Sequence, residues 1–289
     1  MKIEPSELII NSDGSIYHIN LLPSEIADTI LLVGDPGRVA TVSSFFDSIE
    51  VKKQNREFYT HTGTYKGKRI SVMSTGIGTD NLDIVINELD ALVNIDLQKR
   101  EIKDKLSSLT LIRLGTSGAL QEDIPVHTFL MSETACGFDG LLNFYEKRNE
   151  VCHLDIEAAF KKHTDWNPLL TSPYFVDCCS SLSKKFTECT PGITISSPGF
   201  YGPQGRVLRL GLVDANINDK ISDFSYNGRK ITNYEMECSA LYGLSKLLGH
   251  HALTICTIIA NRRRNEFSKG YHDRVKEMIY MTLETIVAK

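Results

Sequence analysis

The sequence lacks long apolar runs and has no excess of charge of one sign. None of its apolar stretches approaches the ~18 consecutive residues that a membrane-spanning helix needs. The formal net charge is −4, with 32 basic and 36 acidic residues, so no overall positive field attracts nucleic acid or an anionic membrane. Any anion site must therefore be a local cluster of arginines.

The cysteines lack the spacing of a metal site or a disulfide framework. Seven of them are scattered along the chain, with one adjacent pair (Cys178 and Cys179) and no C-x-x-C motif. This pattern favours reduced thiols in a cytosol and no bound metal. The amino terminus has early acidic residues and a proline in place of an apolar segment, so no signal peptide is expected. We therefore expect a soluble, cytoplasmic protein that binds neither membranes nor nucleic acid.

What the chain does contain is an alternation of apolar runs and amphipathic segments. Strands are expected at residues 29–33, 56–60, 70–73, 109–112, 127–132, 192–196, 231–234 and 252–259. Helices are expected at residues 39–46, 80–95 (capped by Asp80), 154–162, 174–189, 239–248 and 274–287. No linker or internal repeat divides the 289 residues. The pattern predicts a single α/β domain over residues 1–289, with a large twisted, mostly mixed sheet flanked by helices and a charged, solvated insertion near 95–108.

Residues 111–118 join a buried-strand signal to groups that suit an anion. The apolar run ends in Arg113, Thr116 and three small residues (Gly115, Ser117 and Gly118). A guanidinium can donate to two oxygens, and glycines let backbone N–H groups approach a ligand. The alternative is a buried arginine paired with a core carboxylate and followed by an ordinary glycine turn. This stretch by itself favours neither interpretation.

Two more arginines lie near glycine-rich turns. Residues 34–38 read Gly-Asp-Pro-Gly-Arg between a strand and an expected helix, whose free N–H groups and dipole favour an anion. Arg56 begins the next expected strand. Together with Arg113, these arginines suggest a site for a dianionic oxyanion such as phosphate.

Two further clusters suit a nucleoside. The amide of Gln204 and the guanidinium of Arg206 match the edge of a planar heterocycle with one N–H between two carbonyls, as in uracil, and Phe200 can stack on its face. Residues 235–237 (Glu-Met-Glu) offer a carboxylate for two vicinal hydroxyls and a thioether for a sugar ring. The alternatives are a surface turn for the first cluster and a helix N-terminal acid for the second.

The order of these motifs resembles the hexameric nucleoside phosphorylase family, and within it the uridine-cleaving members. The motifs are G-D-P-x-R at 34–38, R-E-F at 56–58, S-T-G-I-G at 74–78, R-x-G-T-x-G at 113–118, F-Y-x-x-Q-x-R at 200–206, E-M-E at 235–237 and N-R at 261–262. The combination is specific, although no single motif is. The resemblance covers residues 16–289 and implies a pentosyltransferase of pyrimidine salvage that splits uridine reversibly with phosphate into uracil and ribose 1-phosphate.

The resemblance also implies residue roles. Phosphate would be bound by Gly34, Arg38, Arg113 and Thr116, and by Arg56 of a neighbouring subunit. The ribose would be bound by Glu235, Met236 and Glu237, and its 5′-hydroxyl by His18 across a dimer interface. The base would be bound by Phe200, Gln204, Arg206 and Arg262. The catalytic residues would be Arg113, Thr116, Gln204, Arg206 and Glu237.

The chemistry needs no protein nucleophile, metal or organic cofactor, because phosphate itself attacks the sugar. Donors at Gln204 and Arg206 would stabilise the charge that develops on the departing base. Residues 258–261 (Ile-Ile-Ala-Asn) offer no carboxylate where a purine-cleaving relative carries an acid, which favours pyrimidines. A monovalent-cation site of some relatives uses a Glu, a carbonyl and a Ser. Glu57 and Ile77 match it, but Asn81 replaces the serine, so a potassium ion stays open.

A shared site implies a homo-oligomer with the dimer as the site-forming unit and a hexamer as the expected assembly, although the residues do not decide between the two. Three other functions also stay open. One is a phosphorylase of broader nucleoside range. The others are a hydrolytic nucleosidase, which would need a carboxylate to activate water and no arginine cluster, and a nucleoside-binding protein without catalysis.

Overall fold

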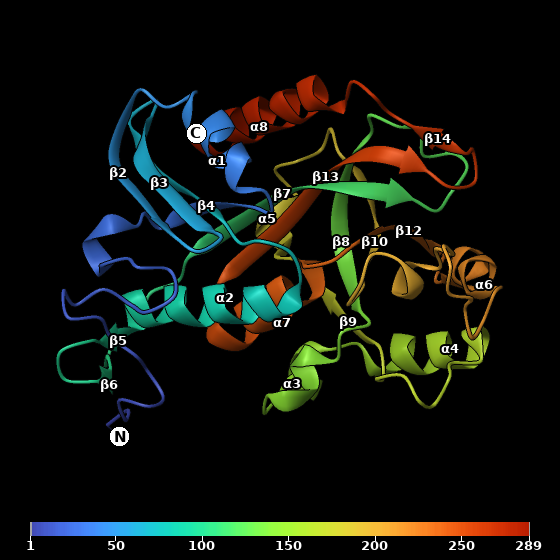
Figure 1. Cartoon of the computed structure of the whole chain (residues 1–289), viewed down its shortest axis with the longest axis horizontal. Coiled ribbons are helices and arrows are strands. Elements are labelled where there is room, and N and C mark those ends of the chain that lie inside the picture. The colour runs from blue at the N-terminus through green and yellow to red at the C-terminus, as the bar shows by residue number, and fades with distance from the viewer. Residues whose placement is uncertain (1, 289) are drawn as a thin grey trace.

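Most of the apolar runs become strands of one mixed β-sheet in the computed structural model, which describes residues 2–288 (Figure 1). The strand order is β11-β12-β10-β8-β13-β7-β1-β4-β3-β2, with β14 paired to β13 and β9 paired to β8. The strands of this sheet are β1 (Thr29–Val33), β2 (Ser48–Asn55), β3 (Phe58–Tyr65), β4 (Lys68–Ser74), β7 (Thr110–Ala119), β8 (Phe129–Gly137), β9 (Tyr174–Asp177), β10 (Thr190–Ser196), β11 (Ser225–Tyr226), β12 (Arg229–Glu235), β13 (His251–Asn261) and β14 (Glu266–Phe267). The predicted fold class is confirmed.

The sheet curls until part of it closes into a ring. Besides pairing with β10, β12 pairs antiparallel with β7, placing Asn233 opposite Ala119 and Tyr234 opposite Gly118. Because β12, β10, β8, β13 and β7 are consecutive neighbours, this extra pairing makes a closed, barrel-like ring. The carboxyl end of β12 is thereby held against the carboxyl end of β7.

Helices cover both faces of the sheet (Figure 1). On one face α1 (Pro36–Ser43) packs on β3 and β4, and α8 (Tyr271–Val287) packs on β7 and β13. On the other, α2 (Thr79–Asn94) packs on α7 (Cys238–Leu248), which lies on β8 and β13. The remaining helices are α3 (Arg148–Val151), α4 (Leu154–Thr164), α5 (Ser180–Ser183) and α6 (Ile217–Asp223), with 3-10 turns at Pro23–Glu25, Leu141–Phe144 and Gly202–Gln204. No helix within residues 2–288 is long and apolar enough to cross a membrane.

Three local predictions were wrong. The helix expected over residues 174–189 is the strand β9 followed by the short helix α5, because Tyr174–Asp177 pairs with β8 as a buried apolar strand. Helix α1 begins at Pro36, since the Asp35 side chain accepts from the Gly37 N–H at 2.9 Å and proline suits the first helical turn. Asp80 lies inside the first turn of α2, and Gly78, with φ of 100°, is the residue that caps it.

The charged segment after α2 forms a small hairpin of β5 (Ile95–Asp96) and β6 (Glu101–Ile102). Residues 101–108 are all exposed to solvent, as predicted. That this segment is an insertion stays a prediction.

Candidate active site

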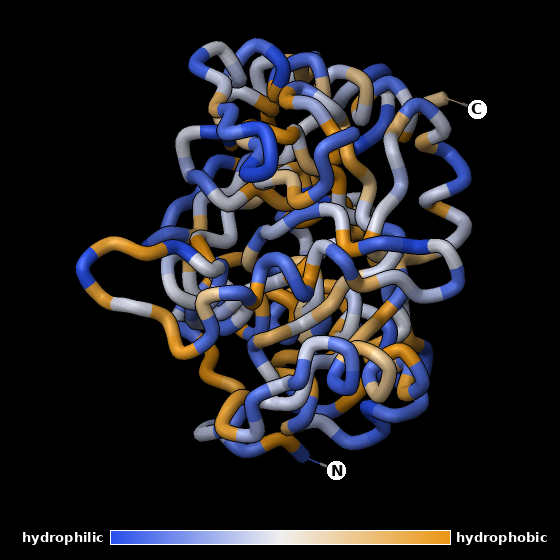
Figure 2. Tube along the Cα trace, turned by 90° about the vertical axis from the view of Figure 1, so that its right-hand side faces the viewer, coloured by the Kyte–Doolittle hydropathy of each residue, from blue (hydrophilic) through white to orange (hydrophobic). Residues whose placement is uncertain are grey.

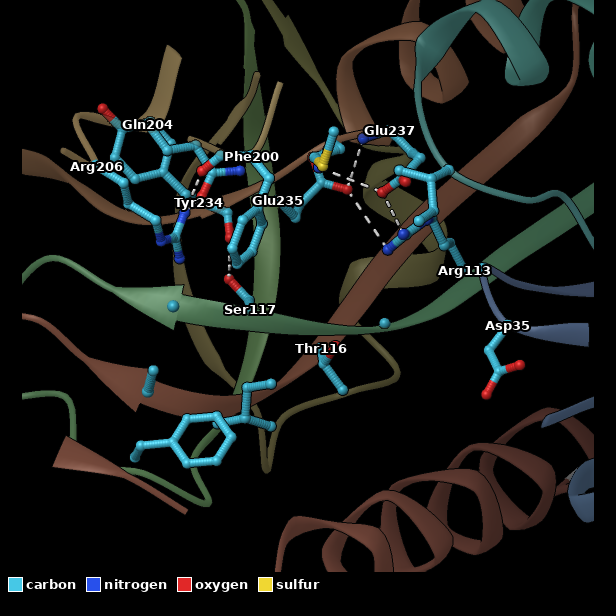
Figure 3. A pocket seen from close by; sticks show the side chains of 18 of the residues that line it. Asp35, Arg113, Thr116, Ser117, Phe200, Gln204, Arg206, Tyr234, Glu235 and Glu237 are labelled. Atoms are coloured by element: carbon cyan, nitrogen blue, oxygen red, sulfur yellow. Dashed lines mark hydrogen bonds and ion pairs between the residues drawn. The ribbon is translucent and has the colours of Figure 1, made fainter. Parts of the chain in front are cut away.

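A cleft of about 1140 Å³ brings together segments that are far apart in the sequence (Figure 3). Of the thirteen predicted site residues, eleven line it: Gly34, Arg38, Arg113, Thr116, Phe200, Gln204, Arg206, Glu235, Met236, Glu237 and Arg262. His18 and Arg56 do not. The cleft therefore contains both the anion cluster and the nucleoside clusters of the sequence.

Arg113 is buried between two carboxylates on the wall of the cleft. Its Nη2 is ion-paired with Glu237, and its Nη1 lies 3.4 Å from Glu235 Oε2 (Figure 3). Burial lowers the pKa of Arg113, but the negative charges of Glu237 and Glu235 outweigh it and raise the pKa above its ordinary value. Nε and Nη1 have no hydrogen-bond partner. Arg113 is thus a carboxylate-paired arginine that still has donors available for a ligand.

A second arginine is held near the first. Arg38 donates to the carbonyl of Leu114 at 3.1 Å from its place in α1. Burial, together with repulsion from Arg113, lowers the pKa of Arg38. Arg113 is buried and Arg38 is half-buried, and two guanidinium groups that repel each other are stabilised by an anion placed between them. The turn at residues 34–37 adds a helix N-terminus to the same wall.

Residues 115–118 are not the turn or strand end that the sequence suggests. They continue β7, which pairs with β13 through Ala119. Gly115 is required there for space, because a Cβ at this position would lie 2.2 Å from Arg113 Nη1 and 2.9 Å from Cys256 Sγ. Thr116 lines the cleft but points away from the two carboxylates (Figure 3).

If the oxyanion expected from the sequence is phosphate, we expect Gly115→Ala to weaken its binding, because the new methyl group displaces the Arg113 guanidinium. Loss of one bidentate charge-assisted contact of about 1.5–3 kcal/mol raises the KM for phosphate roughly 10- to 100-fold. Initial rates against phosphate concentration measure this. Gly118→Ala is the control for adding a methyl group to β7, since nothing lies within 4 Å of its Cβ position, and it should not lower the melting temperature.

The two glutamates of residues 235–237 have different surroundings. Glu235 accepts hydrogen bonds from the N–H groups of Glu237 at 2.9 Å and Cys238 at 3.0 Å, so it is the helix N-terminal acid of α7 that the alternative interpretation expected. Burial raises the pKa of Glu235 to about 7, and Arg113 offsets only part of this. Glu237 instead accepts from the Gly78 N–H at 3.0 Å and pairs with Arg113. Glu235 therefore holds the start of α7, and Glu237 is held by Arg113, which lines the cleft, and by the Gly78 N–H at the start of α2.

Gln204 and Arg206 lie on the opposite side of the cleft from Arg113, and they do not form a surface turn (Figure 3). Gln204 is only 3% exposed, and its Oε1 accepts from Arg206 Nη1 at 2.5 Å. The Arg206 guanidinium lies 3.6 Å from the centre of the Phe200 ring. Arg262 Nη1 donates to the main-chain carbonyl of Gln204. Burial, with repulsion from Arg262, lowers the pKa of Arg206 to about 10, so it stays charged at neutral pH.

Sequence reasoning missed Tyr234 and the structural role of Asn261. Tyr234 lines the cleft, with the Arg262 guanidinium 5.4 Å from its ring centre; its place directly before the Glu-Met-Glu motif was the available signal. Asn261 donates from Nδ2 to the carbonyls of Gln121 at 2.8 Å and Ile124 at 2.7 Å. Its amide is thus occupied by the main chain, and it fixes the end of β13 that carries Arg262.

His18 and Arg56 form a separate patch outside the cleft. His18 Nδ1 lies 2.6 Å from Glu88 Oε1, and the His18 carbonyl accepts from Asn55 Nδ2 at 2.8 Å. The Arg56 guanidinium is 6.0 Å from the ring centre of Tyr17. Neither side chain reaches the cleft of its own chain.

Comparison with known proteins identifies the family. The family model of the phosphorylase superfamily matches residues 28–288. The chain belongs to this superfamily. It is 32% identical to a uridine phosphorylase of Thermococcus kodakarensis over 89% of this chain and 82% of the relative, and 28% identical to a DeoD-type purine nucleoside phosphorylase of Streptococcus suis over 94% of this chain and 99% of the relative.

Solved structures agree with this assignment. A Trypanosoma brucei nucleoside phosphorylase that shows uridine phosphorylase activity superimposes with a TM-score of 0.86 at 29% identity, covering 98% of this chain and 100% of that one. A uridine phosphorylase of Phytophthora capsici, with a TM-score of 0.73 at 21% identity over 97% of this chain and 96% of that one, shares the fold. The chain is therefore an enzyme of the nucleoside phosphorylase family.

The residues that match the cation site of some phosphorylases lie near one another, and whether a potassium ion binds there stays a prediction. Asn81 donates from Nδ2 to the Ile77 carbonyl at 3.3 Å, so an N–H group faces the oxygen that a cation would use. Within residues 2–288, no group of three or more His, Cys, Asp or Glu side chains is arranged to hold a metal ion.

An apolar loop follows Gln204 in this phosphorylase. Residues 206–213 project from the body of the chain and are largely apolar (Figure 2). Leu208, Leu210 and Val213 are 74%, 78% and 94% exposed. Apolar side chains exposed to this degree beside a ligand cleft are typical of a segment that gains contacts when a ligand or another subunit is bound.

Proposed function

We propose that this phosphorylase catalyses the reversible phosphorolysis of uridine to uracil and ribose 1-phosphate. The observation that carries the proposal is a single cleft that places three groups together. Arg38 and Arg113 lie on one side, Glu237 lies beside Arg113, and the Gln204–Arg206 pair lies on the other side. The similarity to the Thermococcus kodakarensis uridine phosphorylase and to the Trypanosoma brucei structure supports uridine as the substrate.

In this proposal phosphate binds Arg38, Arg113 and Thr116 beside the turn that begins at Gly34. The anion replaces the repulsion between the two arginines with attraction and is the nucleophile on C1′ of the ribose. Positive charge develops on the sugar as the glycosidic bond breaks, and the bound phosphate stabilises it.

The nucleoside would be bound by the remaining cleft residues. Glu237 would accept hydrogen bonds from the 2′- and 3′-hydroxyls, and Met236 would lie under the sugar. Glu235 would hold these two residues in place by accepting from the N–H groups that begin α7. Gln204 and Arg206 would donate to the uracil carbonyls, where negative charge develops as the base leaves. Phe200 would turn from Arg206 to the base, and Arg262 would support the loop through the Gln204 carbonyl.

We also propose a homo-oligomer, with a dimer as the site-forming unit and a hexamer as the assembly, in the cytoplasm and in pyrimidine salvage. Arg56 and His18 would reach a neighbour's phosphate and 5′-hydroxyl, which accounts for their distance from the cleft of their own chain. In this proposal phosphate is a co-substrate and no organic cofactor takes part, while a monovalent cation at a subunit interface stays open.

A phosphorylase of broader range is the second candidate, which the similarity to DeoD-type purine nucleoside phosphorylases supports. The residue at position 261 argues against a broader range. It is an asparagine whose amide donates to two main-chain carbonyls, so no acid is present there to protonate a purine.

One assay tests the function directly. Uridine is incubated with the protein with and without phosphate, and uracil and ribose 1-phosphate are measured. We expect release only with phosphate. Release without phosphate would mean a hydrolase, and absence of release with measurable uridine binding would mean a binding protein. Inosine in place of uridine tests the broader range.

Gln204→Ala should weaken uridine use while leaving phosphate affinity near wild type. The variant removes the buried amide that faces the base, a loss of about 2–3 kcal/mol, so kcat/KM for uridine falls roughly 30- to 150-fold. Initial rates with each substrate varied in turn separate the two effects. A change confined to the KM for phosphate would contradict the base assignment.

Mixing two inactive variants should restore activity if the site is shared. Arg56→Ala and Glu237→Gln homo-oligomers are each impaired, but a mixed dimer has one site with both native residues. Random reassembly therefore returns about a quarter of the wild-type sites. Refolding or dissociation and mixing, followed by the uridine assay, measures this. Activity that stays at the sum of the two variants would place Arg56 outside the site.

A further inference from the structure

A second cavity lies at the far ends of α7 and β13 from the cleft. It has a volume of about 430 Å³, and its lining includes Cys179, Ser245, Lys246, His250 and His251. The cleft begins where α7 starts and β13 ends, whereas this cavity lies toward the end of α7 and at the start of β13. The two cavities share no lining residue.

A thiol and an imidazole meet at this cavity. Cys179 Sγ lies 3.5 Å from His251 Nδ1 and 3.1 Å from Ser181 Oγ. The Cys179 N–H donates to the Ala252 carbonyl at 2.9 Å, which fixes the thiol beside the strand that carries the histidine. Cys179 is partly accessible and His251 is exposed. An imidazole nitrogen in contact with an accessible thiol can accept its proton.

Cys179 differs from the other cysteines because its thiol is both partly accessible and in contact with an imidazole. All seven are free, and five of them are buried. The remaining one, Cys152, is also partly accessible, but burial raises the pKa of its thiol to about 11, with Arg148 offsetting only part. Burial likewise raises the pKa of the adjacent Cys178 thiol to about 11. The ring of His153, the residue after Cys152, pairs with Asp177, and no contact joins it to the Cys152 thiol. Cys152 is therefore a control for an accessible thiol without an imidazole in hydrogen-bond contact.

The cavity also holds a buried polar atom without a hydrogen-bond partner. Ser245 is 1% exposed, and its Oγ has none. His250 also lines the cavity, but its Nε2 lies 3.2 Å from Asp90 Oδ1, a residue outside the lining. Buried polar atoms without partners are costly, and a ligand can satisfy them. Asp177 is the one carboxylate of the lining, and it is occupied by His153 at 2.7 Å and by the Thr134 hydroxyl at 2.6 Å. With Lys246 and His251 exposed at the rim, the cavity suits a small molecule that carries carboxylates.

We propose that Cys179 is a modification site for small anionic disulfides of the oxidised-glutathione type. His251 Nδ1 accepts the thiol proton, and the Cys179 thiolate attacks one sulfur of the reagent. The reagent's S–S bond breaks as the new protein S–S bond forms, and the thiolate that leaves takes up the proton. The disulfide reagent is itself the oxidant, and its carboxylates lie against Lys246.

The experiment treats the reduced, native protein with oxidised glutathione and maps the adduct by mass. We expect one adduct, on Cys179, that disappears in Cys179→Ser and persists in Cys152→Ser. His251→Gln should slow its formation at least about fivefold at pH 7. Modification of Cys152 at the rate of Cys179, absence of an adduct, or an unchanged rate in His251→Gln would overturn the proposal.

A neutral reagent tests recognition by the cavity. Lys246→Gln should slow the reaction with oxidised glutathione but leave that with 2-hydroxyethyl disulfide unchanged, since only the former carries carboxylates. Equal slowing with both reagents would refute the anion contact. The readout is mass, so the result does not depend on whether the chain cleaves uridine, and Cys179→Ser should retain wild-type melting and turnover.

Discussion

Replacing Arg113 by alanine should lower kcat/KM for uridine phosphorolysis by about 10³- to 10⁴-fold, equivalent to about 4–5.5 kcal/mol of transition-state stabilisation. The guanidinium is the group that contacts Glu237 and also keeps unpaired donors in the cleft. The change also leaves two buried carboxylates, Glu235 and Glu237, without their cation, at a cost of about 3–5 kcal/mol of folding stability. Steady-state rates and thermal unfolding measure the two effects.

Arg113→Lys separates catalysis from folding. Lysine restores a positive charge between the carboxylates, so most of the melting temperature should return. Its single ammonium cannot bond the carboxylate and the phosphate in the geometry of a guanidinium, so the rate should stay at least about 10²-fold low. Near wild-type turnover in this variant would show that Arg113 has only a structural role.

Glu237→Gln should lower kcat/KM for uridine by about 10²- to 10³-fold and remove the preference for uridine over 2′-deoxyuridine. The substitution keeps the size of the side chain and its bond from the Gly78 N–H. It removes the charge that strengthens two hydrogen bonds from ribose hydroxyls, each of about 1.5–3 kcal/mol. The ratio of kcat/KM for the two nucleosides is the measurement, because it is insensitive to the amount of folded enzyme.

Glu235→Gln is the matched control for the neighbouring carboxylate. Glu235 bonds the N–H groups that begin α7, so this variant should lower the melting temperature and leave the uridine to 2′-deoxyuridine ratio near wild type. If the ratio changed in Glu235→Gln and not in Glu237→Gln, the roles assigned to the two glutamates would have to be exchanged.

The parts of the fold that the sequence predicts are those with strong local signals. Residues 29–33 are an apolar run and residues 192–196 alternate isoleucine with small or polar residues, and both are strands as expected. The helix predicted over residues 174–189 was wrong. Its apolar residues recur at helical spacing, but pairing with β8 makes the first part of the segment a strand. Strand β2 was missed because Ser48–Asn55 is largely polar and lies at the edge of the sheet.

The site was predictable in its residue types but not in its internal contacts. Glycine turns next to arginines indicate an anion site, and the family resemblance extends this to thirteen residues, of which eleven line one cleft. The pairing of Arg113 with Glu237 depends on the contact between β7 and β12, which joins segments more than a hundred residues apart. No local pattern encodes such a contact.

The pairing of β12 with β7 also divides the cleft residues into those fixed by the sheet and those carried by a connection that can change. Arg113 and Thr116 lie on β7 and Glu235 ends β12, and the ladder between these two strands joins the carboxyl end of β7 to the last residues of β12, so the spacing of these side chains is set by paired backbone. The groups next to the base come instead from the connection between β10 and α6, outside the ladder. A new base preference can therefore arise by exchanging that connection while the ladder stays unchanged, which is consistent with the resemblance of this chain to relatives named for purines and for uridine alike.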